Sequence, residues 1–527
     1  MAGERSWWGW GAPERALSDT ECAELGALLP GLPDRPLPVP RLADLALPPV
    51  RIRPPAALAG TMTDSPRERA GHTYGKAYRD VVRALRGDLA AAPDLVARPR
   101  GEADVRDVLD WAERSDIAVV PYGAGSSVVG GVEYRGDAHR GVVSLDLSVL
   151  DRVLEVDRTS RAARIQAGVL GPALEERLRP HGLTLRHFPQ SFEYSTVGGW
   201  LATRSGGHYA TVLTHIDDLV ESLRVVTPAG VAESLRVPGS GAGPSPDRFF
   251  LGSEGALGVI TEAWLRLQDR PRYKASASVL FDGFAAGAEA VRAIAQSGLN
   301  PANCRLLDAG EAALSGAARD GRSVLVLGVE SAHGPVDGRL AELTALAADH
   351  GGRLRAPAGA DGGGSGASAA EAWRSAFLRM PYVRDGLARM SAISETFETA
   401  CTWDRLPGLL DAVRTELAAA VRKATGSPGM INCRFTHVYP DGPAPYFTVI
   451  AAGRPGDELA VWDEIKAAAM EILAARGATV THHHAVGRDH LPGYRRQIPA
   501  PYALALRAAK QALDPEGVLN PGVLGLG

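Results

Sequence analysis

Residues 121–131 read Pro121-Tyr122-Gly123-Ala124-Gly125-Ser126-Ser127-Val128-Val129-Gly130-Gly131, directly after an apolar segment, 117–121, that predicts a buried strand. Closely spaced glycine and serine let consecutive backbone N–H groups converge on an anion, as in a phosphate-binding nest. An ordinary glycine turn would look the same. The loop is not a Walker loop, since no Gly-Lys-Ser/Thr follows, and it does not open a helix with GxGxxG.

Two further glycine-rich stretches follow it along the chain. They are Ser195-Thr196-Val197-Gly198-Gly199-Trp200-Leu201-Ala202-Thr203-Arg204-Ser205-Gly206-Gly207 and Gly252-Ser253-Glu254-Gly255-Ala256-Leu257-Gly258-Val259-Ile260-Thr261. The chain holds 60 glycines among 527 residues, well above the usual share of about 7%. Such an excess indicates either flexible linkers or a backbone that lies against a ligand. Residues 357–366 fit the linker reading, because they are low in complexity and predict a mobile segment.

Composition narrows the class of protein. Hydrophobic residues make up 45% and charged residues 22%, so the chain can bury a large core in two to four domains. The formal net charge of −4 leaves no basic footprint for nucleic acid. The four cysteines are far apart without a CxxC pair, which disfavours structural zinc and disulfides and fits a reducing compartment. We expect no secretory signal, and the sequence contains no apolar run of 18 residues.

Hydrophobic periodicity predicts alternating helices and strands, hence an α+β fold, with a domain boundary at 270–272. Residues 1–60, rich in proline, predict an extended wrapping segment. The predicted strands are 94–99, 117–121, 142–147, 153–156, 163–167, 219–226, 259–267 and 323–329, and the predicted helices are one or two within 61–90, then 102–114, 284–297 and 339–349.

The three glycine stretches, in order and at this spacing, resemble the FAD-binding half of the vanillyl-alcohol-oxidase type flavoproteins. Further motifs resemble the alkyl-dihydroxyacetone-phosphate synthase family, and together they cover nearly the whole chain. These motifs are residues 190–200, Arg305-Leu306-Leu307-Asp308, residues 394–399, Cys433-Arg434-Phe435-Thr436 and His482-His483-His484-Ala485-Val486-Gly487. The resemblance implies a two-subdomain FAD-binding domain plus an α+β cap, divided as 1–90, 91–271, 272–490 and a C-terminal segment, 491–527, that returns to the FAD domain.

The resemblance also implies which residues bind the cofactor. Covalent members place a histidine or cysteine in the first loop, where this chain has Ser126 and Ser127, so we expect non-covalent FAD, with His208 as the main caveat. The expected cofactor-binding residues are Pro121, Tyr122, Gly123, Ala124, Gly125, Ser126, Ser127, Gln190, Ser191, Phe192, Glu193, Tyr194, Ser195, Thr196, Thr203, Arg204, Ser205, Gly206, Glu254, Gly255, Ala256, Leu257, Gly258, Val259 and Ile260.

Tyr446 matches the family's acid/base tyrosine, although a tyrosine in an apolar run is otherwise a half-buried strand residue. A phenol with a pKa near 10 is a poor base at neutral pH. We expect cations to lower that pKa, with His482, His483, His484 and Arg434 as the candidates. The three histidines are predicted on a strand, where at most two share a face. We therefore expect them to polarise substrate or flavin, and we expect no metal.

Arg384 matches the family's substrate-binding arginine, and a guanidinium suits a phosphate or carboxylate. Arg434 is a second substrate-binding candidate, and Arg305 matches a family arginine with an equally plausible architectural role. Related 2-hydroxyacid dehydrogenases carry an Asp-Gly-Asn metal motif that residues 433–439 lack. Ala485 and Arg488 replace a glycine and a lysine of the familiar animal sequences, which leaves the substrate chains open.

The resemblance implies exchange of the acyl chain of acyl-dihydroxyacetone phosphate for a fatty alcohol, through an adduct at flavin N5 and without net redox. The alternatives are an FAD-dependent oxidase or dehydrogenase of a hydroxylated small molecule, and a flavin-binding protein without turnover. We expect lipid substrates, a homodimer and no nucleic acid partner. The expected compartment is the bacterial cytoplasm, with peripheral contact at the inner membrane surface.

Overall fold

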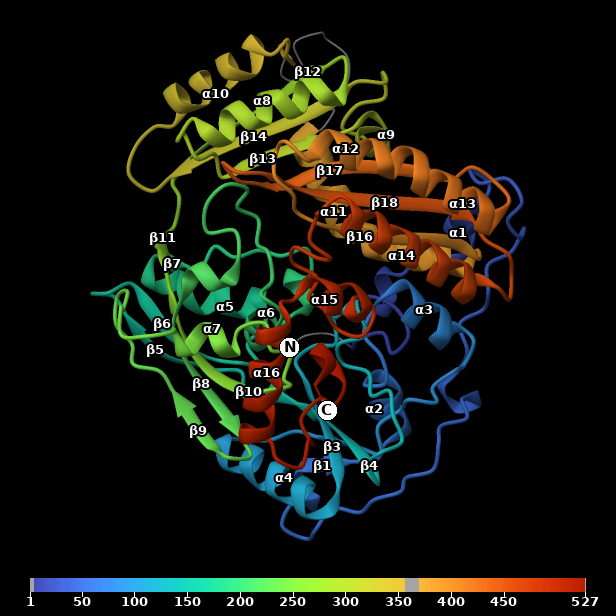
Figure 1. The fold of residues 1–527 in the computed structure, drawn as a ribbon, viewed down its shortest axis with the longest axis vertical. Coiled ribbons are helices and arrows are strands. Elements are labelled where there is room, and N and C mark those ends of the chain that lie inside the picture. The colour runs from blue at the N-terminus through green and yellow to red at the C-terminus, as the bar shows by residue number, and fades with distance from the viewer. Residues whose placement is uncertain (1–3, 356–368, 527) are drawn as a thin grey trace.

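The computed structural model describes residues 4–355 and 369–526, so the low-complexity segment predicted at 357–366 lies outside the described residues. Figure 1 shows two layered halves, one built mainly from residues 95–269 with the C-terminal helices, the other from residues 273–475. The four cysteines are buried and unpaired. In the described ranges, no helix is both long and apolar enough to cross a bilayer.

The first sheet carries the loop quoted above. Its strand order is β1-β2-β4-β3, with β2, β4 and β3 parallel, and the loop starts where β3 ends. Helix α4, predicted at 102–114, packs on this sheet through Val105, Val108, Leu109 and Ala112, which recur on one face of the helix. The bounds are β1 Met62–Thr63, β2 Leu95–Ala97, β3 Ile117–Tyr122, β4 Gly141–Asp146, α2 Pro66–Gly71, α3 Tyr78–Leu85 and α4 Glu102–Ser115.

The second sheet is antiparallel in the order β5-β6-β10-β8-β9, and β7 pairs with β11 beside it. Helix α6 starts at the second glycine stretch, where Thr196 caps it by accepting from the Gly199 N–H. The bounds are β5 Val153–Asp157, β6 Ala162–Gln166, β7 Leu183–Thr184, β8 Val220–Thr227, β9 Gly230–Glu233, β10 Val259–Arg266, β11 Gln268–Asp269, α5 Gly171–Leu178, α6 Val197–Thr203 and α7 Pro246–Phe250.

The third sheet, β15-β12-β14-β13-β17-β18-β16, is antiparallel and forms the cap. Side chains alternate between its faces, as strand geometry requires. Phe397, Phe435 and Phe447 pack into the core under the helices, whereas Thr396, Arg434 and Tyr446 face the opposite side. The strands are β12 Tyr273–Phe281, β13 Asn303–Leu307, β14 Ser323–Ser331, β15 Arg353–Leu354, β16 Ala392–Glu398, β17 Met430–Val438 and β18 Pro443–Ala452.

Helices cover one face of the cap sheet and line the seam with the other half (Figure 1). The helix bounds are α8 Phe284–Gln296, α9 Ala309–Leu314, α10 Asp337–Asp349, α11 Ala369–Arg389, α12 Leu406–Ala412, α13 Ala418–Thr425 and α14 Glu458–Ala475. Apart from β1, the N-terminal region holds short helices, of which α1 spans Asp19–Gly26 and packs on α11.

The C-terminal segment returns to the first sheet. After α15 (Leu491–Gln497) and α16 (Ala500–Leu513), Leu519 forms a parallel bridge with Val119 of β3. The Asn520 side-chain amide donates to the carbonyl oxygens of Gly131 and Glu254, at 3.0 and 2.7 Å. The chain end thus ties the first and third glycine stretches together.

Candidate active site

A cavity of about 610 Å³ lies between the cap sheet and the glycine-rich loops. One wall is backbone and small side chains from the first two glycine stretches. The opposite wall comes from the cap strands β16, β17 and β18 and from α11. Predicted residues that line it are Gly123, Ala124, Gly125, Ser126, Ser127, Gln190, Ser191, Ser195, Thr196, Thr203, Ser205, Gly206, Arg384, Arg434, Tyr446, His483 and His484.

Several glycines of this wall admit no side chain. A Cβ on Gly123 would lie 2.3 Å from the Thr196 hydroxyl oxygen, and one on Gly206 would lie 2.9 Å from the His437 ring. The two loops therefore meet closely and present backbone to the cavity. Such a wall fits a large, flat cofactor carrying a pyrophosphate, which is the fit that FAD requires.

Other predicted cofactor residues do not line the cavity. Glu193 forms an ion pair with Arg15, and Arg204 forms one with Asp217. Glu254 accepts the N–H groups of Val486 and Gly487, so it holds the segment after the histidines. The remaining ones outside the lining are Pro121, Tyr122, Phe192, Tyr194, Gly255, Ala256, Leu257, Gly258, Val259 and Ile260.

Tyr446 sits in the middle of a charged row across three cap strands. Its cross-strand partners are Glu398 on β16 and Arg434 on β17. The Arg434 guanidinium lies 3.8 Å from the centroid of the Tyr446 ring and also pairs with the buried carboxylate of Glu311. A planar cation is therefore fixed against the phenol by the sheet register.

Burial raises the pKa of Tyr446 above its usual value of 10, and Arg434 only partly offsets that rise. The predicted net lowering of this pKa is therefore wrong. The phenol is held in its protonated form, so at rest it offers a proton.

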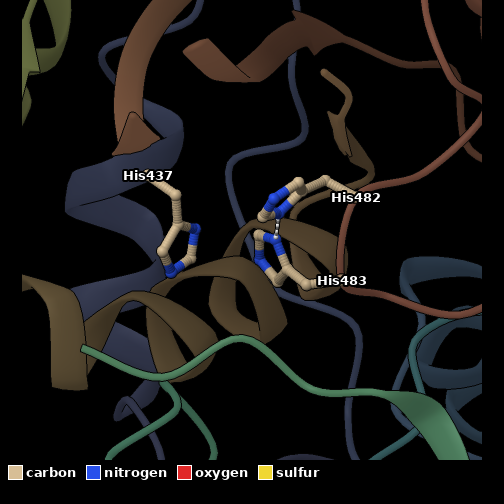
Figure 2. Close-up of side chains that lie close together, drawn as sticks. All are labelled: His437, His482 and His483. Atoms are coloured by element: carbon tan, nitrogen blue, oxygen red, sulfur yellow. Dashed lines mark hydrogen bonds between the residues drawn. The ribbon is translucent and has the colours of Figure 1, made fainter. Parts of the chain in front are cut away.

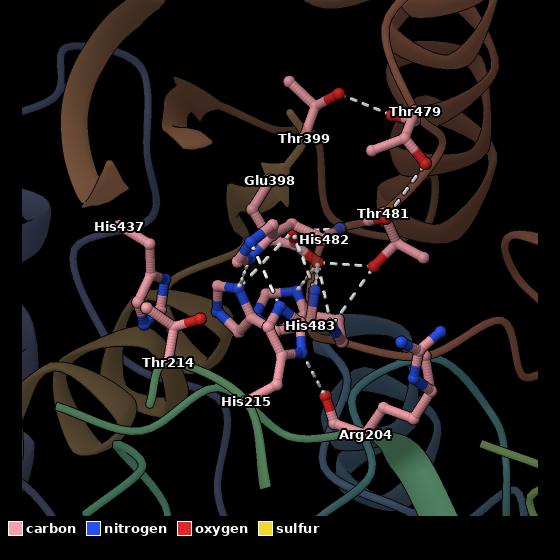
Figure 3. A network of polar contacts seen from close by, with 12 residues as sticks. Arg204, Thr214, His215, Glu398, Thr399, His437, Thr479, Thr481, His482 and His483 are labelled. Atoms are coloured by element: carbon pink, nitrogen blue, oxygen red, sulfur yellow. Dashed lines mark hydrogen bonds and ion pairs between the residues drawn. The ribbon is translucent and has the colours of Figure 1, made fainter. Parts of the chain in front are cut away.

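The histidine segment is not a strand, contrary to the prediction. Residues 482–484 form a bend whose three successive N–H groups all donate to the Glu398 carboxylate, at 2.8 Å for His484 (Figure 3). The Thr481 hydroxyl donates to the same carboxylate. One buried anion therefore shapes the loop and aims neighbouring rings in directions that a strand would not allow.

The histidines are neutral rather than cationic. Burial lowers the pKa of His482 and His483, and it lowers the pKa of His484 to about 3, although Glu398 opposes this. The expectation that they act as cations on Tyr446 is wrong for the same reason: they lie in a desolvated site. Burial opposes the charge of Glu398, but the Thr481 hydroxyl and three backbone N–H groups donate to its carboxylate and hold its pKa well below the usual range, so the charge persists.

Arg384 and Arg305, which both match family arginines, line the cavity, and each already contacts other groups of the protein. Arg384 lines it, pairs with Asp385 at 2.7 Å and donates to the carbonyl of Lys76. Arg305 also lines it. His208 packs against the rings of Phe188 and Tyr209 and is not among the residues that line the cavity, whereas Ser126 and Ser127 of the first loop are.

Sequence reasoning assigned no role to two residues of the site, Glu398 and His437. Glu398 stood in the motif 394–399, and its alternation with Ser394 and Thr396 could have placed it on the cavity face. His437 lines the cavity from the end of β17, next to His482 and His483 (Figure 2). No local pattern signals that contact, because it depends on the bend at Glu398.

Comparisons with known proteins agree with the geometry. Residues 93–236 match the family described as FAD binding domain, and residues 270–524 match FAD linked oxidases, C-terminal domain. An alkyldihydroxyacetonephosphate synthase from Dictyostelium discoideum is 30% identical over 532 residues, covering 94% of this chain and 85% of that protein.

Solved structures show the same relationship. A structure of an alkyldihydroxyacetonephosphate synthase superposes with a TM-score of 0.80 at 26% identity and covers 98% of each chain. The 4-ethylphenol oxidase from Gulosibacter chungangensis shares the fold, with a TM-score of 0.68 at 16% identity over 89% of this chain and 94% of that one. The predicted α+β fold, with a vanillyl-alcohol-oxidase type FAD-binding domain and a cap, is confirmed. FAD is the cofactor, and the chain belongs to the alkyldihydroxyacetonephosphate synthase family of FAD-dependent enzymes.

Proposed function

We propose that this protein exchanges the acyl chain of acyl-dihydroxyacetone phosphate for a fatty alcohol, using non-covalently bound FAD. The observation that carries the proposal is the pair of facing walls. Glycine-rich backbone lies on one side of the cavity, and Tyr446 with Arg434 lies on the other. Family membership supports the same reaction class.

The cavity offers both environments that such a substrate needs. Arg305, Arg379 and Arg384 lie in its wall, and guanidinium groups suit a phosphate. Apolar side chains line the rest and suit an alkyl chain. They are Leu25, Leu28, Phe377, Met380, Leu387 and Ile450.

Oxidised FAD, when bound, supplies an electrophilic ring that makes the C1 carbon of the substrate acidic. The exchange needs a group that takes the C1 proton and later returns it, and the Tyr446 hydroxyl oxygen is our candidate. Because burial keeps this phenol protonated, a proton has to leave it first. His484, whose ring centroid lies 5.6 Å from that of Tyr446, is neutral, and the Glu398 charge stabilises the imidazolium that would form.

Tyr446→Phe tests the assignment. Losing an acid/base group reduces rates by about 10²–10⁴-fold, so we expect a loss of that size in fatty-acid release from acyl-dihydroxyacetone phosphate and fatty alcohol under anaerobic conditions. The visible FAD spectrum of the purified variant should match that of the wild type. A fully active Tyr446→Phe enzyme would show that another group moves the proton.

The same assay tests the reaction class. Exchange leaves the flavin oxidised at the end, whereas an oxidase or dehydrogenase of a hydroxylated small molecule bleaches it without oxygen. Fatty-acid release with oxidised flavin supports exchange. Bleaching by hydroxy acids without any fatty-acid release would contradict it.

We also propose a cytoplasmic homodimer in peripheral contact with a membrane. Lipid substrates favour such contact, and Leu28, 75% exposed and part of the cavity lining, is placed to meet an apolar surface. Light scattering coupled to size exclusion checks the dimer, and flotation with anionic vesicles checks the membrane contact.

A further inference from the structure

Four histidines from three distant parts of the chain meet beside the cavity. His215 lies shortly before β8, His437 lies near the end of β17, and His482 and His483 lie on the bend at Glu398 (Figure 3). One ring nitrogen from each of His437, His482 and His483 lies within 4.8 Å of the other two. Figure 2 shows the His437 ring turned toward this pair.

His437 presents a ring-nitrogen lone pair that no group within residues 4–355 and 369–526 uses. Its side chain is buried, with 1% of its surface exposed. Its Nε2 lies 2.9 Å from the carbonyl oxygen of Gly207, so this nitrogen carries the proton and donates it. Its Nδ1 has no hydrogen-bond partner in the described part of the chain. A backbone carbonyl on the far nitrogen is the usual outer partner of a metal-ligating histidine.

A chain of hydrogen bonds fixes the proton of His482 on its Nε2, so that its Nδ1 bears a lone pair as the Nδ1 of His437 does. The His215 Nδ1 lies 3.0 Å from the carbonyl of Arg204 and donates to it, so the Nε2 of a neutral His215 is an acceptor. His482 Nε2, 3.2 Å away, therefore carries a proton, and the Tyr439 hydroxyl lies 2.7 Å from it. The remaining nitrogen, His482 Nδ1, then bears a lone pair.

His483 completes the set. Its Nδ1 lies 3.0 Å from the His482 Nδ1 and 3.6 Å from the Glu398 carboxylate. Ligands at about 2.0–2.1 Å from a tetrahedral zinc ion are about 3.4 Å apart, so a small movement of these rings would admit an ion. Without an ion, one proton shared by the Nδ1 atoms of His482 and His483 still leaves the buried Nδ1 of His437 without a hydrogen-bond partner in the described part of the chain.

We propose that His437, His482 and His483 bind one divalent transition-metal ion of the zinc class through their Nδ1 atoms. His437 and His483 line the cavity, so the fourth ligand position opens toward it. The nearby Glu398 carboxylate adds a negative charge that favours the cation. We expected no metal because a strand at 482–484 would turn at most two of the rings to one face, and that strand does not form. This site is independent of the proposed exchange reaction.

The test uses the full-length FAD-loaded protein, stripped with a chelator and then titrated with Zn²⁺ by calorimetry, and with Co²⁺ followed by visible absorption. We expect one ion per chain and the intense visible bands of tetrahedral Co²⁺. His437→Gln should weaken Zn²⁺ binding at least about 100-fold, since even the loss of an outer partner costs 10–100-fold. His333→Gln, at an exposed position, is the matched control and should bind like the wild type.

Tyr439→Phe provides a second measurement that leaves all three ligands in place. It removes the hydroxyl beside His482 Nε2, so Zn²⁺ affinity should fall about 10-fold. The flavin spectrum and the thermal midpoint verify that each variant is folded. Less than one ion per wild-type chain would overturn the proposal, and so would a folded His437→Gln or Tyr439→Phe that binds Zn²⁺ like the wild type.

Discussion

At the scale of the residue, Glu398 organises the site. Its carboxylate is buried, stays ionised and accepts three consecutive backbone N–H groups and a threonine hydroxyl. Each of these hydrogen bonds is charge-assisted, and the set fixes the path of residues 481–484. The same residue neighbours Tyr446 across the strands. The Glu398 carboxylate thus fixes the conformation of the histidine bend and places a negative charge beside the Tyr446 phenol.

We expect Glu398→Gln to disturb both stability and exchange. An amide has one acceptor oxygen, and its NH₂ group would face backbone donors, so unfolding should become easier by on the order of 3 kcal/mol. The thermal midpoint and the anaerobic exchange rate measure the two effects. Glu416→Gln, at an exposed ion pair with Arg476, is the control and should stay within about 0.5 kcal/mol of the wild type. An unchanged midpoint in Glu398→Gln would mean that the bend forms without the charge.

At the scale of the element, helix α3 carries a buried carboxylate whose ionised form is unfavourable in the folded protein. Asp80 is fully buried near its N-terminus and accepts from the Ala77 N–H. Burial, together with the charges of Asp489 and Glu133, raises the pKa of Asp80 to about 7. The folded state therefore binds a proton between about pH 4 and pH 7 that the unfolded state releases.

Stability should fall as the pH rises through that window, because the Asp80 proton is then lost at a cost in free energy. Asp80→Asn keeps the acceptor for Ala77 and removes the titration, so its thermal midpoint should depend less on pH between 4 and 7. Asp88→Asn, at an exposed neighbouring carboxylate, is the comparison. Parallel pH profiles for wild type and Asp80→Asn would show that Asp80 titrates normally.

Elements with a strong period were predictable from sequence, and the site was predictable only in part. The apolar face of α4 and the buried strand β3 follow from local spacing and formed where expected. The bend at 482–484 did not follow, because a carboxylate some 80 residues earlier overrides local preference. His215 and His437 reach that bend only because distant segments pack together in the folded protein, and the same packing buries the histidines of the bend and keeps them neutral. Spacing along the chain cannot encode either.

At the scale of the whole molecule, the C-terminal segment closes the FAD-binding half. Asn520 donates to two buried carbonyl oxygens, and the buried Lys510 donates to the carbonyl oxygens of Ala256 and Leu519. Both sets of hydrogen bonds reach the glycine stretches from the end of the chain. The geometry of the cofactor wall therefore depends on residues far from it in sequence.

Asn520→Ala should weaken FAD binding and lower the thermal midpoint together. The substitution leaves two buried carbonyl oxygens without their donor, which costs about 1–3 kcal/mol. If all of this free energy is lost from the folded glycine-rich loops, the affinity for FAD falls about 5–150-fold. Fluorescence titration of the apoprotein with FAD measures the affinity. Gln511→Ala, which removes a single exposed hydrogen bond to Pro515, is the control. A normal FAD affinity in Asn520→Ala would show that the glycine-rich loops keep their conformation without the two hydrogen bonds from Asn520.

The bridge between Val119 and Leu519 also has a consequence for biosynthesis. A ribosome completes β3 long before it makes the residue that pairs with it, and the rest of the cofactor-binding half, the cap and the C-terminal helices emerge between the two events. The cofactor-binding half therefore stays unfinished until translation ends, while the cap sheet can already assemble on the nascent chain. Flavin capture becomes a post-translational event, and a prematurely terminated chain would leave the ribosome as a folded cap joined to an open, flavin-free half.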